Sequence, residues 1–162
     1  MSERIEPPFM SGRLFALDHE MTSDDWYTPA WMFDRMGVTF DLDVCAPPGG
    51  VPWVPAARFL TVTDDGLTQP WTGRVWMNPP YSAPRPWIER FAAHRDGVAL
   101  LIHSKSHAMT RLWADADGWA VVPPPVRFTG APNSLPYPLS IVAYGAECVA
   151  AIARIGVVRH VA

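Results

Sequence analysis

The residues best suited to chemistry are Asn-Pro-Pro-Tyr at positions 78–81, directly after the apolar run 74–77 (RVWM). The apolar run predicts a strand, and the two prolines end it because proline fixes φ and lacks an N–H. The turn is therefore stiff, and its carbonyls stay free to accept hydrogen bonds. Asn78 and the Pro79 carbonyl could hold a planar amine while the ring of Tyr81 stacks on its heterocycle. This arrangement suits methylation of an amino group on a base; a proline-rich turn with a packing tyrosine is the structural alternative.

A second predicted strand end carries a carboxylate. Residues 38–46 (VTFDLDVCA) read as a strand, and the small and proline residues 46–50 (APPGG) follow it. Small residues and glycines let the backbone approach a ligand closely. Asp43 could there hold a cationic amino group or a ribose, although a loop or cap role is the alternative.

Two further carboxylates, Asp64 and Asp65, precede Gly66. An acid in this region could accept a hydrogen bond from the exocyclic amine of a cofactor purine. Turn formation beside the glycine is the stronger alternative for this pair.

The elements that must position these residues alternate between strands and helices. Helices are expected after Thr28-Pro29, read as an N-cap and first helical residue, and over 84–95 and 106–115. Strands are expected over 38–46, 58–62, 74–77, 98–103, 118–128 and 139–144. This order predicts an α/β fold with a doubly wound, mainly parallel sheet and a C-terminal antiparallel strand pair. Ligands of such sheets bind at the carboxyl ends of the strands.

Composition narrows the class of protein. The chain has 162 residues, of which 49% are apolar and 18% charged. We expect one domain over 23–162, preceded by a flexible arm over 1–22. No apolar run reaches the roughly 20 residues that cross a bilayer, and the start has no signal-peptide pattern. Two cysteines form neither a disulfide framework nor a zinc set, so we expect no metal and a cytoplasmic protein.

The net charge of −3 is distributed unevenly. Residues 1–73 contain 4 Lys/Arg and 11 Asp/Glu, whereas residues 74–127 contain 7 and 4. Nucleic acid requires cations, so the overall charge argues mildly against it. A lopsided field could still face DNA on one side only.

An ordered set of motifs resembles the phage-type DNA N-6-adenine methyltransferases. The set comprises 25–29 (DWYTP), 40–46 (FDLDVCA), 65–67 (DGL), 71–82 (WTGRVWMNPPYS), Leu100–Ile102, Trp113, Arg127-Phe128 and 133–138 (NSLPYP). Asn-Pro-Pro-Tyr alone also occurs in protein-glutamine and RNA methyltransferases, so the order of the whole set carries the resemblance. It covers roughly residues 24–144.

The resemblance implies a Rossmann-like methyltransferase fold that binds S-adenosylmethionine. Trp26, Thr28 and Pro29 would contact the cofactor, the last two at its methionine end. Its main pocket would be formed by Asp43, Cys45 and Ala46, and its adenine or ribose would meet Asp65, with Asp64 beside it. Asn78, Pro79 and Pro80 would form the catalytic turn that holds the target amine, with Tyr81 stacked on the base. Phe128 would cover the other face of that base or lie in the core.

The implied reaction is methyl transfer to the N6 amine of an adenine flipped out of double-stranded DNA. Direct transfer needs positioning more than a dedicated base, so His103 and His107 are expected to have packing or surface roles. Such a protein would be encoded by a phage or prophage. The alternatives are a methyltransferase for another amide or amine, in protein glutamine or RNA, and an inactive cofactor-fold binding module. The sequence carries no signal for the recognised DNA site or the oligomeric state.

Overall fold

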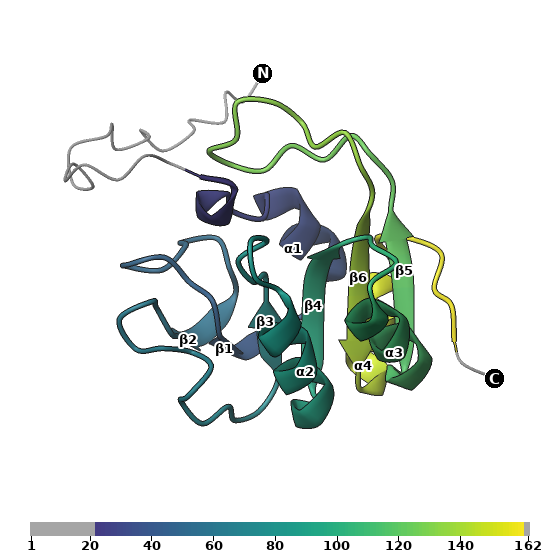
Figure 1. Cartoon of the computed structure of the whole chain (residues 1–162), viewed down its shortest axis with the longest axis horizontal. Helices are drawn as coiled ribbons and strands as arrows, with labels where there is room; N and C mark the ends of the chain where they lie inside the picture. Colours follow the sequence, from purple (N-terminus) through teal and green to yellow (C-terminus); the bar gives the residue numbers. More distant parts are fainter. Residues whose placement is uncertain (1–21, 161–162) are drawn as a thin grey trace, which may run out of the picture.

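The computed structural model describes residues 22–160, which form an α/β protein around one six-stranded sheet (Figure 1). The strands are β1 (Phe40–Asp43), β2 (Ala56–Phe59), β3 (Val75–Met77), β4 (Gly97–Ile102), β5 (Gly118–Val122) and β6 (Leu139–Tyr144). Their order in the sheet is β2-β1-β3-β4-β6-β5. Neighbours from β2 to β4 pair in parallel, whereas β6 is antiparallel to both β4 and β5. The sheet is therefore mixed, and the predicted antiparallel pair near the C-terminus is confirmed.

Helices cover both faces of the sheet. On one face, α1 (Ala30–Met36) and α4 (Ala146–Ile152) pack against Phe40 and Trp76. On the other face, α2 (Arg85–His94) and α3 (His107–Asp115) pack against Leu42 and Val75. Figure 1 shows α2 and α3 in front of the sheet and α4 behind it. Because successive strand residues point to opposite faces, one strand supplies both cores.

The central strands are apolar along their whole length because both of their faces are covered. Residues 97–101 of β4 and all six residues of β6 are buried. The continuous apolar run at 98–103 therefore predicted a buried strand correctly, with a shift of one residue. Its neighbour β6 enters the sheet between β4 and β5, so the strand order differs from the chain order.

Several predicted boundaries were too long. The strand β5 ends at Val122, short of the predicted end at 128, because Pro123–Pro125 follow and proline cannot donate to a ladder. The first strand is only Phe40–Asp43, and β2 lies at Ala56–Phe59 instead of 58–62. The helix α1 has Pro29 at its N-cap, so the Thr28 side chain does not cap it.

Two elements were not predicted. A short 3-10 helix, η1 (Ser23–Asp25), begins with a capping box between Thr22 and Asp25, and this spacing was a readable signal. The helix α4 buries Cys148, Ala151 and Ile152, which follow the i, i+3, i+4 pattern of a helix face.

The predicted arm, apart from Thr22, lies outside the described residues. No helix in the described part of the chain is long and apolar enough to cross a membrane. Within residues 22–160, no three His, Cys, Asp or Glu side chains are grouped so that they could hold a metal ion.

Candidate active site

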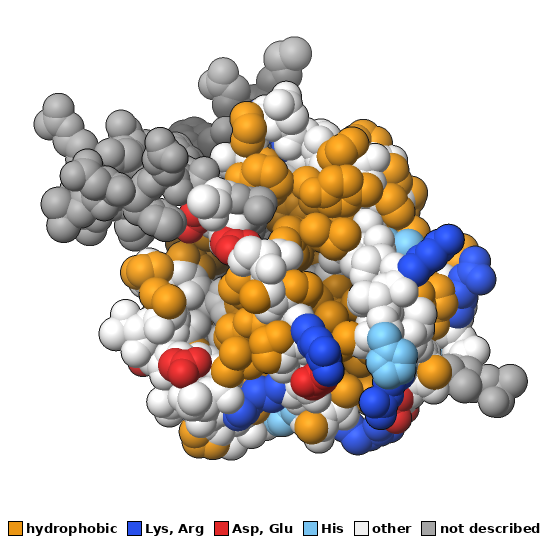
Figure 2. Space-filling view, in the orientation of Figure 1, with side chains coloured by type: hydrophobic (Ala, Val, Ile, Leu, Met, Phe, Trp, Pro, Cys, Tyr) orange, Lys and Arg blue, Asp and Glu red, His pale blue; other side chains and the backbone are white. Residues whose placement is uncertain are grey.

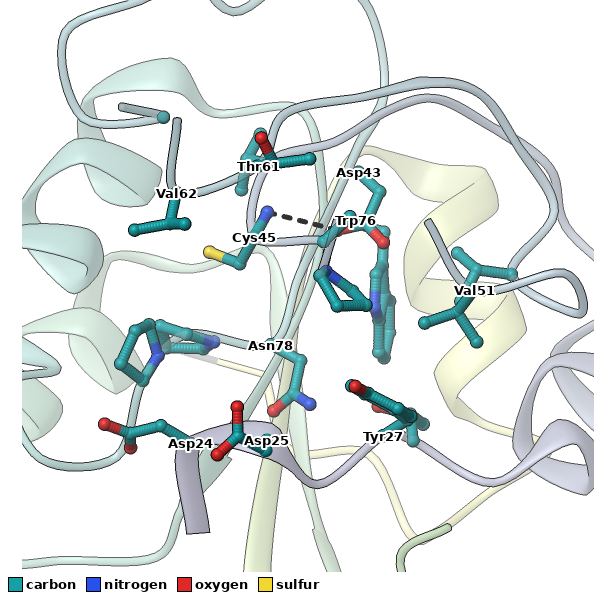
Figure 3. Close-up of a pocket in the computed structure, with 18 of the residues that line it drawn as sticks. Asp24, Asp25, Tyr27, Asp43, Cys45, Val51, Thr61, Val62, Trp76 and Asn78 are labelled. Carbon is teal, nitrogen blue, oxygen red and sulfur yellow. Dashed lines mark hydrogen bonds between the residues drawn. The ribbon is translucent and has the colours of Figure 1, made fainter. Parts of the chain in front are cut away.

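A cavity of about 400 Å³ lies at the carboxyl ends of β1 and β3. The strand β1 ends in Asp43 and β3 runs into Asn78, and both side chains face the cavity in Figure 3. The walls include the apolar Val51, Val54 and Trp76. Its volume is within the range of roughly 300–1,000 Å³ typical of small-molecule sites. No Lys or Arg is among the described residues that line it.

Asp43 is a buried carboxyl at the end of β1. It is 5% exposed, and its Oδ1 accepts a hydrogen bond from the Cys45 N–H at 3.1 Å. Burial raises the pKa of Asp43 to about 7, although the Cys45 hydrogen bond opposes this shift. A cation bound beside it would favour the ionised form and lower that pKa. The group is therefore suited to bind a cationic ligand.

Three polar atoms on the cavity residues are buried without a hydrogen-bond partner among the described residues. They are Thr28 Oγ1, Asn78 Oδ1 and the Tyr81 hydroxyl. Leaving such a group unsatisfied costs about 1–3 kcal/mol, and buried polar groups are normally paired. Burial also raises the pKa of Tyr81, so its hydroxyl remains a donor at neutral pH. A ligand that fills the cavity could supply the missing partners.

The segment 22–28, here called the strap, forms one side of the cavity. Asp24 accepts hydrogen bonds from the Ser82 N–H at 3.2 Å and from Ser82 Oγ at 2.6 Å. Tyr27 exchanges two backbone hydrogen bonds with Thr129, at 3.0 and 2.9 Å. The strap is thereby fixed to the turn after Tyr81 on one side and to the loop after β5 on the other. Figure 3 shows Asp24, Asp25 and Tyr27 on one side of Asn78 and Cys45 on the other.

Gly66 brings the loop that follows β2 against the end of β1. A Cβ at this position would lie 2.3 Å from the Val44 carbonyl oxygen and 3.0 Å from the Trp87 ring. Glycine is therefore required by close packing. The approach places Asp65 at the cavity, whereas Asp64 is exposed and accepts hydrogen bonds from the Thr61 N–H and Oγ1 at 2.8 and 2.9 Å.

The structure gathers ten of the thirteen predicted site residues around this cavity. They are Trp26, Thr28, Asp43, Cys45, Ala46, Asp65, Asn78, Pro79, Pro80 and Tyr81. Three predicted residues do not line it. Pro29 is the buried N-cap of α1, and Asp64 holds its own turn. Phe128 is 1% exposed in the core, with its ring edge-to-face to Tyr81 at 6.2 Å between centroids.

His103 has a packing role in the structure. Its ring stacks on Trp113 at 4.8 Å, and its Nδ1 lies 2.8 Å from Ser140 Oγ. It is not among the residues that line the cavity.

Sequence reasoning missed the strap residue Asp24 and its partner Ser82. The capping box around η1 could have indicated the local turn at Asp24. Their contact joins residues 58 positions apart in the chain, so no local sequence pattern predicts it. Sequence reasoning also missed Trp76 as a residue of the cavity wall, because a tryptophan within an apolar strand is expected to lie in the hydrophobic core.

A cavity at the strand ends of an α/β sheet, lined by the Asp43 carboxyl and the Asn78 amide, has the position and the polar groups of a small-molecule binding site. The family described as DNA N-6-adenine-methyltransferase (Dam) matches residues 17–122, and the chain belongs to this family. The matched range contains every residue described as lining the cavity. The family resemblance drawn from the sequence motifs is thus confirmed.

A curated relative supports the same assignment. The DNA N-6-adenine-methyltransferase of Haemophilus phage HP1 is 36% identical over 89 residues, which cover 49% of this chain and 50% of the relative. The chain thus spans about half the length of the curated relative that it matches. No solved structure gives a significant match.

Proposed function

We propose that this protein transfers a methyl group from S-adenosylmethionine to the N6 amine of adenine in DNA. Family membership supports the reaction, and the observation that carries the assignment of the site is the unsatisfied Asn78 Oδ1 in the same cavity as the buried carboxyl of Asp43. Asn78 Oδ1 can accept a hydrogen bond from an amine, and the Asp43 carboxylate can bind a cation. A sheet covered on both faces, with the cavity at its strand ends, supports a Rossmann-like methyltransferase fold.

The charge of the cavity fits a cationic cofactor. Asp24, Asp25, Asp43 and Asp65 line it, and no Lys or Arg does among the described residues. Asp43 would hold the amino group or the ribose of S-adenosylmethionine, with Cys45 and Ala46 beside it. Asp65 would accept from its adenine or ribose.

The strap would also contact the cofactor. Thr28 Oγ1, which is buried and has no partner among the residues that the structure describes, would bind the methionine end of the cofactor, and Trp26 would lie against it. The bound cofactor supplies an electrophilic methyl carbon on a sulfonium.

The turn 78–81 would position the target amine. The adenine N6 lone pair is delocalised into the ring, so the amine is a poor nucleophile. Hydrogen bonds to Asn78 Oδ1 and the Pro79 carbonyl favour a tetrahedral nitrogen with its lone pair free. With the cofactor bound, its methyl group would replace one amine proton, which would leave to solvent, and the bonding pair to the methyl group would stay on the cofactor sulfur. Positioning and charge stabilisation suffice, without a dedicated base.

Tyr81 would stack on the target base, and Phe128 would support Tyr81 from the core. The edge-to-face contact between the two rings limits the orientations open to Tyr81. Extruding a base from duplex DNA costs a few kcal/mol, and stacking on Tyr81 offsets part of this cost.

The test is incubation of purified protein with unmethylated duplex DNA and S-adenosylmethionine, followed by mass spectrometry of the nucleosides. We expect N6-methyladenine with the wild type and none with Asn78→Ala, while calorimetry shows cofactor binding by both. Undiminished N6-methyladenine with Asn78→Ala would overturn the site. Cofactor binding without any methylated base would redirect the search to protein-glutamine or RNA substrates.

A further inference from the structure

Three exposed cations on one side of the molecule form no salt bridge with a described residue. Lys105, Arg111 and Arg127 are exposed, and among the described residues they form no ion pair, side-chain hydrogen bond or ring contact. We call these three residues the cationic shoulder. Arg111 is near enough to Asp115 for its charge to help lower the pKa of that carboxyl, but Asp115 is already paired with Arg95. No ion pair or ring contact accounts for Lys105 or Arg127 among the described residues.

The other described arginines are all engaged locally. Arg74, Arg85 and Arg95 pair with Glu147, Glu89 and Asp115. Arg58 bonds to Thr72, and Arg90 and Arg154 donate to backbone carbonyls. Arg35 and Arg159 lie over the rings of Trp31 and Trp119. Among the described Lys and Arg side chains, only those of the shoulder lack a salt bridge, a hydrogen bond and a ring contact.

The topology places the shoulder beside the cavity. β3, β4 and β5 run in the same direction, so their carboxyl ends share one edge of the sheet. Lys105 follows β4 at this edge, and Arg127 lies in the loop that follows β5. Arg111 is one turn into α3, which begins at this edge. The loop with Arg127 also supplies Phe128, which contacts the cavity residue Tyr81.

The opposite side of the cavity is acidic. Asp24, Asp64 and Asp65 are exposed carboxylates on the strap and on the loop after β2. In Figure 2 several Asp and Glu side chains lie to the left of the central hollow, and Lys and Arg side chains lie to its right and below it, some of them beside an Asp or Glu. A polyanion approaching the cavity is therefore attracted on the α3 side and repelled on the β2 side.

We propose that duplex DNA lies across the cationic shoulder, with Lys105, Arg111 and Arg127 contacting phosphates beside the target base. The inference rests on the proposed function and adds the face on which the substrate binds. A chain with a net charge of −3 can bind DNA only through a local excess of cations, and the shoulder is such an excess. The acidic side of the cavity, with Asp24, Asp64 and Asp65, then remains clear of the duplex and faces the cationic cofactor.

The experiment measures binding of a fluorescent duplex of about 20 base pairs by anisotropy at several salt concentrations. The slope of log K against log salt is negative, and each lost phosphate contact reduces its magnitude by about 0.9. Each loss also weakens binding roughly eight-fold at 0.1 M salt. We expect Lys105→Ala/Arg127→Ala to lose about two contacts, and added Arg111→Ala to lose a third. The matched control, Arg35→Ala/Arg58→Ala, removes two exposed cations elsewhere and should leave the slope unchanged.

Further readouts separate this inference from the proposed function. Cofactor binding, by calorimetry, should be the same in all variants, and the KM for DNA should rise in the shoulder variants while kcat at saturating DNA is kept. DNA binding by the cationic shoulder would be overturned if the triple variant kept the wild-type salt slope, or if the control variant lost as much slope. Formation of N6-methyladenine by the wild type would still uphold the proposed function in that case. A wild type that binds cofactor but no DNA would overturn both.

Discussion

The two ends of the sheet contain the same pair of residue types in opposite states. At the end where β4 begins and β6 finishes, the Tyr144 hydroxyl donates to Asp115 Oδ2 at 2.5 Å, and Arg95 pairs with the same oxygen at 2.6 Å. At the carboxyl end of β1 and β3, Asp43 has no cation among the residues described at the cavity, and the Tyr81 hydroxyl has no partner. The polar groups around Asp115 therefore satisfy one another, whereas Asp43 and Tyr81 can still bind a ligand.

The two environments shift the pKa values of the two carboxyls in opposite directions. Burial raises the pKa of Asp43 to about 7. Hydrogen bonds from Tyr144 and Arg95 lower the pKa of Asp115. Residue type therefore does not separate a binding group from a structural one; the presence or absence of a partner inside the fold does.

The largest expected effect is that of Asn78→Ala on the reaction. Removing the acceptor should lower the methylation rate about 1,000-fold, since a preorganised polar contact at the reacting group contributes about 4 kcal/mol. The free energy of unfolding should change little, because Asn78 Oδ1 bonds to no group within residues 22–160. Single-turnover kinetics and urea denaturation measure the two effects. Strong destabilisation by this change would remove the contrast between the two ends.

Asp43→Asn should alter how stability depends on pH. The folded pKa of Asp43 is raised, so between about pH 4 and 7 the folded state binds more protons than the unfolded state. The wild type without cofactor should therefore lose about 3 kcal/mol of stability as the pH rises through this window, and the variant should not. Denaturation at pH 5 and pH 8 measures this, and parallel profiles would contradict the unpaired state of Asp43.

The same carboxyl should give cofactor binding a pH dependence. Only the ionised form of Asp43 attracts a cation, so the affinity for S-adenosylmethionine should fall as the pH drops below about 7. Asp43→Asn should bind the cofactor about ten-fold more weakly at pH 8, equivalent to about 1.4 kcal/mol. Calorimetry from pH 6 to pH 8 provides the measurement, and an equally pH-dependent variant would exclude Asp43 as the titrating group.

Tyr144→Phe tests the completed end of the sheet. Loss of the hydrogen bond to Asp115 should lower the free energy of unfolding by about 1 kcal/mol, since the half-exposed carboxylate can be solvated by water. Methylation should be unaffected. Tyr81→Phe is the matched control and should not destabilise the fold, because its hydroxyl has no hydrogen-bond partner in the described part of the chain. Equal destabilisation by the two variants would be inconsistent with the comparison.

The smallest expected effect concerns the contact between the strap and the catalytic turn. Ser82→Ala removes the 2.6 Å hydrogen bond to Asp24 and should lower kcat about three-fold, because the turn carrying Tyr81 is held less firmly. The affinity for cofactor should stay the same. Ser134→Ala, an exposed serine in the loop after β5, is the control. A loss confined to cofactor affinity would show that the contact positions the strap alone.

Much of the site was predictable from local signals in the sequence. Apolar runs that stop at Asp43 and at Asn78 mark two strand ends, and parallel strands bring their carboxyl ends to one edge. Proline at 79 and 80 fixes the turn whatever surrounds it. These features depend on neighbouring residues, so they determined the principal site residues and the order of the elements.

The remaining features depend on residues that are far apart in the chain. The insertion of β6 between β4 and β5, the contact of Asp24 with Ser82 and the burial of Phe128 behind Tyr81 each join distant segments. The sequence also favoured Thr28 as a helix cap, whereas packing left its hydroxyl at the cavity without a partner among the described residues. Local patterns set strand periods, turns and helix ends, but which distant surfaces meet is decided by burial across the whole core. The sequence by itself therefore determined the chemical groups of this protein, and only the tertiary structure decided which of them remain unsatisfied.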